Sequence, residues 1–565
     1  MALEMTRRSA IAATAAAAVA AAATPALAEE EVQAAGGFVT GEALVSKQDY
    51  FGYTSEAPSF MTAPEPVAAD QIVATLDCDV LVIGAGLAGT SAARAAAEGG
   101  AKVICVEKMH QPSCRGAGAG TINSKLSCSF EDGTVKDIPA AEFRWMQTCG
   151  NRLNEALVAK YMYRSGEAAD WLCEAGEKHK CFMGIWDGYS RHELLPDEPG
   201  YVCMSATDDS DINQPYASFV AADVQSIEAM AAGAEFMFEC PAQYLLQDES
   251  GAVTGAIVLD EEGYKQINAP KVIMATGDIG GSEEMMRYYC PEGISIPSVY
   301  TPAGANTGDG HKMILWAGGH MGRAPFATAL HPQRWSDASS NQLEGPFLYV
   351  NEKGERFFNE GTWVQARSLQ IMQNTADDCA WSIFDSSWPE DLMASFPYGG
   401  GMFWDMFRYK GESDYQTTID YYTQSLIDAD GSTYETADTL EELAEKIGVP
   451  ADKLVETVNH YNEICASGVD TDFCKRPELL FPCDTPPFHA SKVGAVLLVV
   501  CGGAVIDANF QCLDVDGNPI PGLYAVGNTS GGTAEVDYPI NVPGNSHGQA
   551  LTQGYLAGRI CAGVE

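Results

Sequence analysis

Residues 79–107 read DVLVIGAGLAGTSAARAAAEGGAKVICVE. The apolar run over 79–83 has the length and composition of a buried strand, and it leads directly into a glycine-rich turn. The Ala-rich stretch over 87–98 predicts a helix, and the apolar run over 102–107 predicts a second strand. The stretch therefore predicts a βαβ unit of an α/β fold, in which the glycine-rich turn opens the helix.

Gly84, Gly86 and Gly89 occupy the three glycine positions of a dinucleotide-binding fingerprint. The first glycine makes the tight turn, the second lets a pyrophosphate approach the backbone, and the third allows close helix–strand packing. The helix N-terminus adds N–H groups and a partial positive charge. Glu107 ends the second strand, where it would accept hydrogen bonds from ribose hydroxyls. The fingerprint predicts a dinucleotide, and by itself it leaves FAD and NAD both open.

Composition and charge exclude several classes of protein. The 565 residues are 46% hydrophobic and 19% charged, which is ordinary for a globular protein and excludes a wholly disordered, collagen-like or coiled-coil chain. With 33 Lys and Arg against 77 Asp and Glu, the net charge of −44 argues against nucleic acid or anionic lipid as a partner. None of the 17 cysteines forms a C-x-x-C pair, so we expect no attached c-type haem and no metal site.

The first 28 residues have the pattern of a twin-arginine signal peptide. Thr6-Arg7-Arg8-Ser9 precedes an Ala-rich stretch over 10–23, and Ala26-Leu27-Ala28 fits a cleavage site. The apolar stretch is too short for a membrane anchor, and we expect no stable membrane insertion elsewhere. The sequence thus predicts export of a folded protein to the periplasm or the extracytoplasmic cell surface.

The remaining chain divides by composition. Residues 29–71 are rich in Glu, Ala and Pro and predict an extended N-terminal arm. Patterning typical of α/β structure covers 72–324 and returns over 491–565, while 325–490 has a different composition. The layout predicts a nucleotide-binding domain built from both parts of the chain, with 325–490 inserted between them.

Two local patterns are clear within these parts. Alternating apolar segments at 234–238, 243–247 and 253–259 predict a small antiparallel element. A helical pair is expected across 439–463, where Thr439 begins a capping box.

Six further motifs follow the fingerprint in order. They are RGAGAGTIN at 115–123, ATG at 275–277, NTGDG at 306–310, LYVNEKGERFFNE at 348–360, PGLYAVGN at 521–528 and GNSHGQALTQGYLAG at 544–558. From about Ser59 to Ala562 the chain resembles the flavoprotein superfamily of fumarate reductases, succinate dehydrogenases and 3-ketosteroid dehydrogenases. Within that superfamily, 59–72 and 538–548 look most like exported respiratory flavin reductases of anaerobic bacteria. The resemblance implies a discontinuous Rossmann-like FAD-binding domain with an inserted α+β capping domain.

The resemblance also implies which residues hold FAD. Ser546-His547-Gly548 heads a helical stretch whose N-terminus would stabilise negative charge on the reduced flavin. In succinate dehydrogenases a His tethers the flavin covalently, and Cys114 stands at that position here, so we expect noncovalent FAD. The expected cofactor-binding residues are Gly84, Gly86, Ala88, Gly89, Glu107, Lys108, Arg115, Gly116, Gly120, Ala242, Asp309, Gly527, Asn528, Ser546 and His547.

The cationic cage of fumarate reductases is largely missing. Those enzymes hold a dicarboxylate with two His and two Arg, and His331 matches one of the four positions. Val364 stands where the proton-donating Arg belongs, Val499 replaces the second His, and Asn541 replaces the second Arg. A dicarboxylate would leave its charges desolvated and unpaired, which makes fumarate and succinate poor candidates.

Three residues are candidates for catalysis. Tyr538 can polarise a carbonyl or donate a proton, as tyrosines do in ketosteroid-dehydrogenase relatives, or it packs under the flavin. His331 is either a substrate ligand or a core histidine, and Arg367 lies three residues out of register with the family's Arg. Arg356 and Glu360 are expected to be a structural ion pair.

Together these features predict an exported FAD-dependent oxidoreductase that reduces an activated C=C bond in an enone or unsaturated acid, and not a dicarboxylate. Because no haem or FMN domain is visible, electrons are expected from an external donor such as a membrane-tethered cytochrome. One alternative is a ketosteroid-type dehydrogenase that works in the oxidative direction. A second alternative is a non-catalytic flavin electron carrier.

Overall fold

The structure is a computed structural model, and it describes residues 58–565 with several gaps. The gaps are 115, 117, 131–134, 187–200, 213–218, 299–303, 334–344, 396–397, 399–422 and 424–432. The predicted signal peptide, most of the predicted arm and Arg115 therefore lie outside the described residues. In the part of the chain that the structure describes, no helix is both long and apolar enough to span a bilayer.

A six-stranded sheet holds the glycine-rich turn. Its order is β17 (Gln511–Leu513), β18 (Pro519–Ala525), β11 (Lys271–Met274), β2 (Val80–Ile83), β3 (Val103–Val106) and β7 (Glu235–Met237). All neighbours are parallel except β17 and β18. With α4 (Leu87–Glu98), β2 and β3 form the βαβ unit that the sequence predicts. Every residue of β2 and β3 is buried, as expected for parallel strands covered on both faces.

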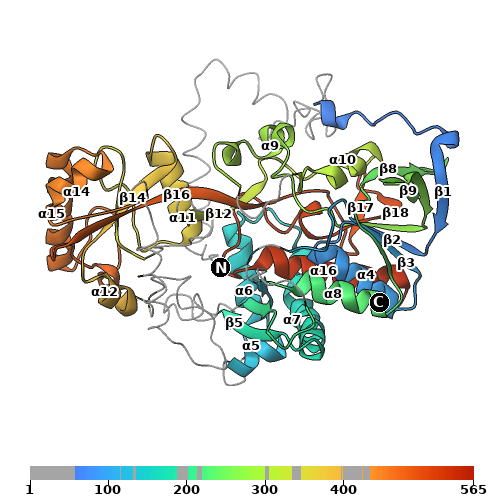
Figure 1. Cartoon of the computed structure of the whole chain (residues 1–565), viewed down its shortest axis with the longest axis horizontal. Coiled ribbons are helices and arrows are strands. Elements are labelled where there is room, and N and C mark those ends of the chain that lie inside the picture. Colours follow the sequence, from blue (N-terminus) through green and yellow to red (C-terminus); the bar gives the residue numbers. More distant parts are fainter. Residues whose placement is uncertain are drawn as a thin grey trace, which may run out of the picture. The chain divides into compact units, whose positions relative to one another are not determined.

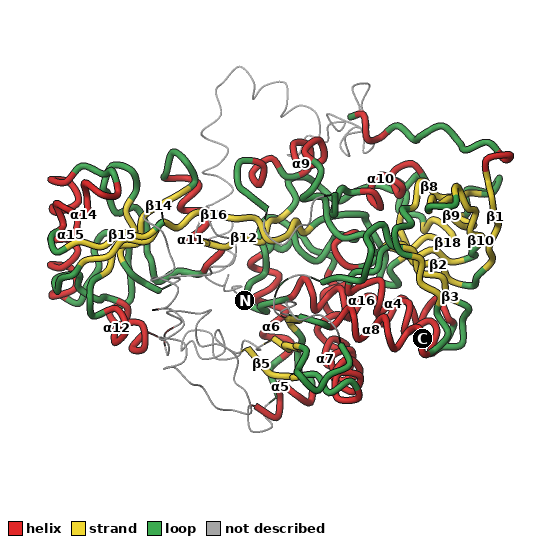
Figure 2. Tube along the Cα trace, in the orientation of Figure 1, coloured by secondary structure: helices red, strands yellow, loops and turns green. Residues whose placement is uncertain are grey.

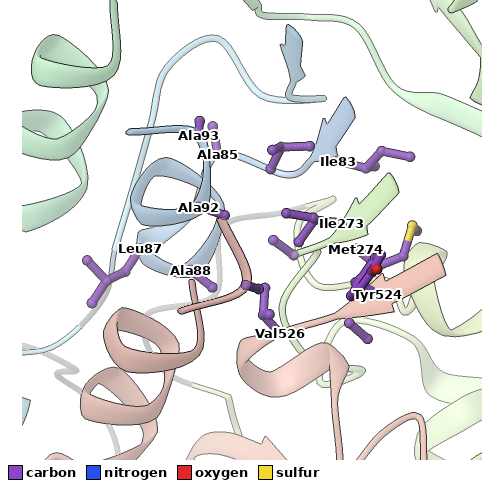
Figure 3. Packing of buried hydrophobic residues seen from close by; sticks show 14 of the residues in the cluster. Ile83, Ala85, Leu87, Ala88, Ala92, Ala93, Ile273, Met274, Tyr524 and Val526 are labelled. Atoms are coloured by element: carbon purple, nitrogen blue, oxygen red, sulfur yellow. The ribbon is translucent and has the colours of Figure 1, made fainter. Parts of the chain in front are cut away.

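Helix α4 lies between this sheet and two other helices. It packs against α8 (Ala221–Ala231) and against α16 (Asn545–Ala562), which comes from the far end of the chain (Figure 1). A Cβ on Gly554 or Gly558 of α16 would lie 2.3 or 2.4 Å from a carbonyl oxygen of α4, so only glycine permits this approach. Figure 3 shows small side chains of α4, including Ala88 and Ala92, on the side toward Val526.

Two smaller sheets flank the nucleotide-binding part. One has the order β1 (Ile72–Asp77), β10 (Gly263–Asn268), β9 (Val253–Asp260) and β8 (Ala242–Gln247), and the other has the order β4 (Gly118–Gly120), β6 (Tyr201–Ser205) and β5 (Phe182–Trp186). β8 and β9 are antiparallel, which confirms two of the three segments predicted for the small antiparallel element. The third segment was assigned wrongly, because β7 pairs in parallel with β3 at the edge of the six-stranded sheet.

The fourth sheet contains one strand of 14 residues, β16 (Phe488–Cys501). It pairs with β14 (Cys379–Phe384) and β15 (Tyr434–Ala437) near its start and with β12 (Ala327–Gln333) further along, while β13 (Leu348–Val350) pairs with β14. β16 runs without interruption across the expected boundary at 490, and it is the long strand of Figures 1 and 2. One strand thus joins the segment predicted as inserted to the following segment.

The remaining helices cover the edges and faces of these sheets. Thr439 Oγ1 accepts from the backbone N of Glu442 at 3.2 Å, which confirms the predicted start of the helical pair. The helices are α5 (Lys125–Phe130), α6 (Ile138–Thr148), α7 (Glu155–Lys178), α9 (Glu283–Tyr289), α10 (Asp309–Trp316), α11 (Val364–Asn374), α12 (Trp388–Ser395), α14 (Leu440–Ile447) and α15 (Ala451–Ser467).

Candidate active site

The glycine-rich turn is shaped by backbone contacts that exclude side chains. Gly84 has a φ of +102°, and a Cβ there would lie 2.4 Å from the carbonyl oxygen of Ala275. A Cβ on Gly89 would lie 1.8 Å from the carbonyl oxygen of Gly84. The turn therefore needs glycine at both positions, for conformation at the first and for close packing at the second.

Glu107 closes the same turn from the end of β3. Its Oε2 accepts from the backbone N of Ala85 at 2.7 Å, and its Oε1 accepts from the backbone N of Met109 at 2.8 Å. The carboxylate is thus fixed beside the turn, and each of its oxygens has a further lone pair for a ribose hydroxyl.

A cavity of about 460 Å³ opens beside this turn. A second cavity of about 50 Å³ adjoins it, and Glu107 and Lys108 line both. The other expected residues that line the larger cavity are Gly86, Ala88, Gly116, Gly527, Asn528, Ser546 and His547, and those that line the smaller one are Gly84, Ala242 and Asp309. The structure therefore brings together residues from six separate parts of the sequence.

Two expected cofactor residues have packing roles instead of lining the described cavities. Gly89 contacts the turn itself. Gly120 of β4 donates from its backbone N to the carbonyl oxygen of Gly544 at 2.8 Å, and its own carbonyl oxygen accepts from the hydroxyl of Tyr161. This contact positions the start of α16.

An ion pair lies between the two cavities. Lys108 Nζ is 2.9 Å from Asp309 Oδ2, and Thr307 Oγ1 donates to the same oxygen at 2.8 Å. Burial raises the pKa of Asp309, but the hydrogen bond and charge of Lys108 outweigh it and hold that pKa below its usual value. Asp309 is therefore a carboxylate at neutral pH.

The other end of the larger cavity is the N-terminus of α16. Ser546 and Asn528 exchange side-chain hydrogen bonds of 3.0 and 3.1 Å, and His547 Nδ1 lies 2.9 Å from the carbonyl oxygen of Gly118. The backbone N of Ser546 donates to the hydroxyl oxygen of Tyr538 at 3.2 Å. The structure thus joins Tyr538 to the helix end that lines the cavity.

Tyr538 is buried among small apolar side chains. It packs with Ala327 and Ala329 of β12 and with Cys501 of β16. Burial raises the pKa of its hydroxyl well above the usual value, so the hydroxyl stays protonated at neutral pH and can donate a hydrogen bond. This environment suits a group that polarises a carbonyl oxygen.

The two other catalytic candidates lie on adjoining elements. His331 is a buried residue of β12, the strand on which Tyr538 packs. Arg367 is on α11, which packs against β12, and it is only 1% exposed. Its Nε donates to the carbonyl oxygen of Thr362 at 2.8 Å and its Nη1 to that of Gly345 at 3.4 Å. Its guanidinium thus serves at least in part to fasten backbone segments.

Neutral residues stand at the three altered cage positions. Val364 is the fully buried first residue of α11, and Val499 pairs with Ala329 between β16 and β12. Asn541 is buried and donates from Nδ2 to the carbonyl oxygen of Ala141 at 3.2 Å. None of the three side chains can pair with a carboxylate as an ion.

The predicted ion pair of Arg356 and Glu360 is confirmed and belongs to a larger network. Arg356 Nε lies 2.8 Å from Glu360 Oε1, and its Nη2 lies 2.8 Å from Asp470 Oδ2. Lys475 Nζ lies 3.2 Å from Glu360 Oε2 and donates to the hydroxyl of Tyr461 at 2.7 Å. Asp470 and Lys475 could not be assigned to this network from the sequence, because no local pattern connects them with 348–360.

Two polar residues near Tyr538 have no role assigned from the sequence. Gln365 Oε1 accepts from the backbone N of Leu330 at 2.7 Å, and its Nε2 donates to the carbonyl oxygen of Thr328 at 2.8 Å. The side chain of Gln365 also hydrogen-bonds to the carboxyl group of Asp537. In the sequence, the only sign that Asp537 belongs to the site is its position next to Tyr538.

Comparison with known proteins decides the family. The profile of a family described as FAD binding domain matches residues 79–539. The chain belongs to this family. It is an FAD-dependent oxidoreductase, as the sequence analysis predicts.

The flavoprotein is similar to curated reductases along most of its length. It is 26% identical to vinyl phenol reductase of Lactiplantibacillus plantarum, over 86% of this chain and 96% of that protein. It is 27% identical to fumarate reductase (cytochrome) of Shewanella frigidimarina, over 86% of this chain and 77% of that protein. A solved 3-ketosteroid-Δ4-(5α)-dehydrogenase from Rhodococcus jostii shares the fold, with a TM-score of 0.67, 22% identity and coverage of 88% and 99% of the two chains.

The residues of the flavoprotein fit FAD. The turn at Gly84 and Gly89 leaves no room for a Cβ, so the backbone itself is open to a close ligand. Glu107 lies beside this turn and has lone pairs that could accept from a ribose hydroxyl. The N-terminus of α16 lines the same cavity. When bound, FAD supplies hydride-transfer chemistry at its isoalloxazine ring. The backbone N–H groups of the two helix ends favour the negative charges of the pyrophosphate and of the reduced ring.

We expect the FAD to be noncovalent. Cys114 lines the larger cavity, and its thiol donates to the carbonyl oxygen of Phe219 at 3.0 Å. Burial raises the pKa of Cys114 to about 12, so almost none of the nucleophilic thiolate is present at neutral pH. Acid precipitation should release FAD into the supernatant, and Cys114→Ser should behave in the same way. Flavin that stays in the wild-type pellet but is released from Cys114→Ser would show a covalent bond to this cysteine.

Proposed function

We propose that this flavoprotein reduces an activated C=C bond in a neutral or monoanionic substrate, with electrons from an external donor. The main support is that Val364, Val499 and Asn541 are neutral. The residues expected to bind the flavin are present, and Tyr538 contacts the N-terminus of α16. The names of the vinyl phenol and fumarate reductases support reduction of a C=C bond. The altered positions favour a substrate without two carboxylates.

Reduction of an activated alkene adds a hydride to one carbon and a proton to the other. The hydride, with both electrons, comes from the bound reduced cofactor. Tyr538 would donate a hydrogen bond to the carbonyl oxygen conjugated with the alkene, because its hydroxyl is protonated and lies at the N-terminus of α16. Positive potential at that helix end would further stabilise negative charge that develops on the carbonyl oxygen.

A comparison of substrates tests the proposal. With reduced methyl viologen as the donor under anaerobic conditions, kcat/KM for the best neutral or monoanionic enone should exceed that for fumarate by at least about 10²-fold. Each missing charge-assisted contact contributes roughly 1.5–3 kcal/mol, and three are missing. Efficient reduction of fumarate would contradict the proposal. Oxidation of a saturated ketosteroid without any alkene reduction would instead support a dehydrogenase.

Substitution of Tyr538 tests its role. Tyr538→Phe keeps the ring among Ala327 and Ala329 and removes only the hydroxyl. Turnover of the enone should fall by about 10²–10⁴-fold if the hydroxyl polarises the carbonyl. FAD content and the flavin absorption spectrum should stay unchanged. Full activity of Tyr538→Phe would show that the hydroxyl is not needed for turnover and that Tyr538 serves only in packing. Tyr163→Phe, on the exposed face of α7, is the matched control.

We further propose that the protein is exported by the twin-arginine route and takes part in anaerobic respiration, with a membrane-tethered cytochrome as the donor. The support is the Arg7-Arg8 pair, the Ala-rich stretch over 10–23 and the Ala-x-Ala site at 26–28. An external donor is required because the chain shows one nucleotide fingerprint and no haem attachment motif.

Replacement of the arginine pair tests this route. In the native host, substitution of both Arg7 and Arg8 by Lys should retain the FAD-loaded precursor in the cytoplasm, as cell fractionation would show. Glu4→Gln, which leaves the pair intact, should be exported normally. Undiminished export of the double variant would contradict the twin-arginine assignment.

A further inference from the structure

The segment that leads into Tyr538 has a strained backbone. The backbone N of Asp537 donates to the carbonyl oxygen of Glu535 at 2.8 Å, which closes a three-residue turn around Val536. Val536 has a φ of +70°, a conformation that β-branched residues rarely adopt, and its side chain is 56% exposed. Neither burial of Val536 nor an ordinary turn preference explains this conformation. Strain of this kind is concentrated at functional sites.

The turn directs a carboxyl group into the protein. Asp537 Oδ1 accepts from the backbone N of Tyr538 at 2.8 Å, and the carboxyl group also hydrogen-bonds to Gln365. Gln365 is in turn bonded to the backbone of Thr328 and Leu330 in β12. Asp537 is therefore held between α11 and β12, next to the strand that carries His331.

The surroundings of this carboxyl group favour its protonated form. Burial raises the pKa of Asp537, the nearby carboxylate of Glu292 adds to the rise, and the hydrogen bonds from Tyr538 and Gln365 oppose it without cancelling it. The turn also includes Glu535, whose pKa burial likewise raises. The thiol of Cys149 faces the main-chain oxygen of Asp537.

Two of the three other candidate residues make hydrogen bonds that suit them for other roles. Two hydrogen bonds of the Arg367 guanidinium fasten it to backbone carbonyl oxygens. The hydroxyl oxygen of Tyr538 accepts from the N-terminus of α16, and its O–H is suited to donate to a carbonyl oxygen. Asp537 is only partly buried, so it can regain a proton from water.

We propose that Asp537 is the proton donor of the reaction, held in place by the turn at Val536 and by Gln365. The inference rests on the proposed function. In the step, the Asp537 carboxyl O–H bond would break as its proton forms the C–H bond at one alkene carbon. The other carbon would take a hydride, with its electron pair, from the reduced FAD that the site would hold. The product would be the saturated compound, and the Asp537 carboxylate would regain its proton from solvent. The cofactor would regain its hydride equivalent as two electrons from the external donor and one proton from solvent.

Kinetics of Asp537→Asn test the proposal. Asn keeps the Oδ1 acceptor for the backbone N of Tyr538 but cannot give up a proton. With reduced methyl viologen and the best enone, kcat should fall by about 10²–10⁴-fold while KM changes little. Reduction of the bound flavin by dithionite should be unaffected. Asp537→Glu should restore part of the rate.

The pH profile separates proton donation from a structural role. Wild-type kcat should fall as the pH rises through the pKa of Asp537, and this alkaline limb should be absent from the residual activity of Asp537→Asn. Asp391→Asn is the matched control, because burial raises the pKa of Asp391 to about 7 on α12, away from Tyr538. The limb should persist in that control. A limb that disappears in Asp391→Asn and persists in Asp537→Asn would overturn the proposal.

Stability gives a readout that does not depend on turnover. Because the folded-state pKa of Asp537 is raised above its unfolded value, the native state binds the proton more tightly, and this contribution to stability is lost as the pH rises through the folded pKa. Asp537→Asn should therefore raise the melting temperature of the FAD-loaded protein at pH 8 and leave it nearly unchanged at pH 4. A lower melting temperature at pH 8 would mark Asp537 as a structural residue and overturn the proposal.

The results distinguish this proposal from the function on which it rests. Absence of alkene reduction by the wild type would overturn the proposed function and this role with it. Normal wild-type reduction together with full activity of Asp537→Asn would overturn only the role of Asp537.

Discussion

Close backbone packing at the glycine-rich turn is the constraint on which the flavin site depends. Helix α4 starts so near β2 that a Cβ on Gly89 would meet the carbonyl oxygen of Gly84. α16 then rests on α4 through Gly554 and Gly558, which leave room for the carbonyl oxygens of α4. Because of this contact, Ser546 at the start of α16 lies at the cavity wall. Two successive glycine contacts therefore set the distance between the two ends of the cofactor site.

A second framework connects the cofactor site with the surroundings of Tyr538. β16 pairs with β14 and β15 in one part of the molecule and with β12 in the other. Tyr538 packs on β12 and hydrogen-bonds to the first turn of α16, so it contacts both frameworks. One continuous strand, β16, therefore pairs with the strand on which Tyr538 packs and also with the strands of the segment predicted as inserted.

Two buried carboxyl groups in this molecule show how environment separates structure from chemistry. Burial raises the pKa of Glu360, but the charges of Lys475 and Arg356 outweigh it and hold the group ionised. At Asp537 burial prevails, and the hydrogen bonds from neutral donors do not offset it. The first arrangement satisfies a charge inside a scaffold, whereas the second favours the protonated form of the carboxyl group. The backbone of Val536, next to Asp537, has a positive φ that costs stability. Such strain is often kept at positions that serve function.

The sequence by itself determined the βαβ unit, the bounds of α4 and the flavin family, because each depends on local spacing or on motifs in fixed order. It misplaced β7, since the same apolar alternation suits an antiparallel hairpin and a parallel edge strand. Only the tertiary structure decided that Gln365 meets Asp537 and that the hydroxyl of Tyr538 meets α16. Such contacts follow from strand pairing and helix packing between distant segments, and no local pattern records which segments will meet.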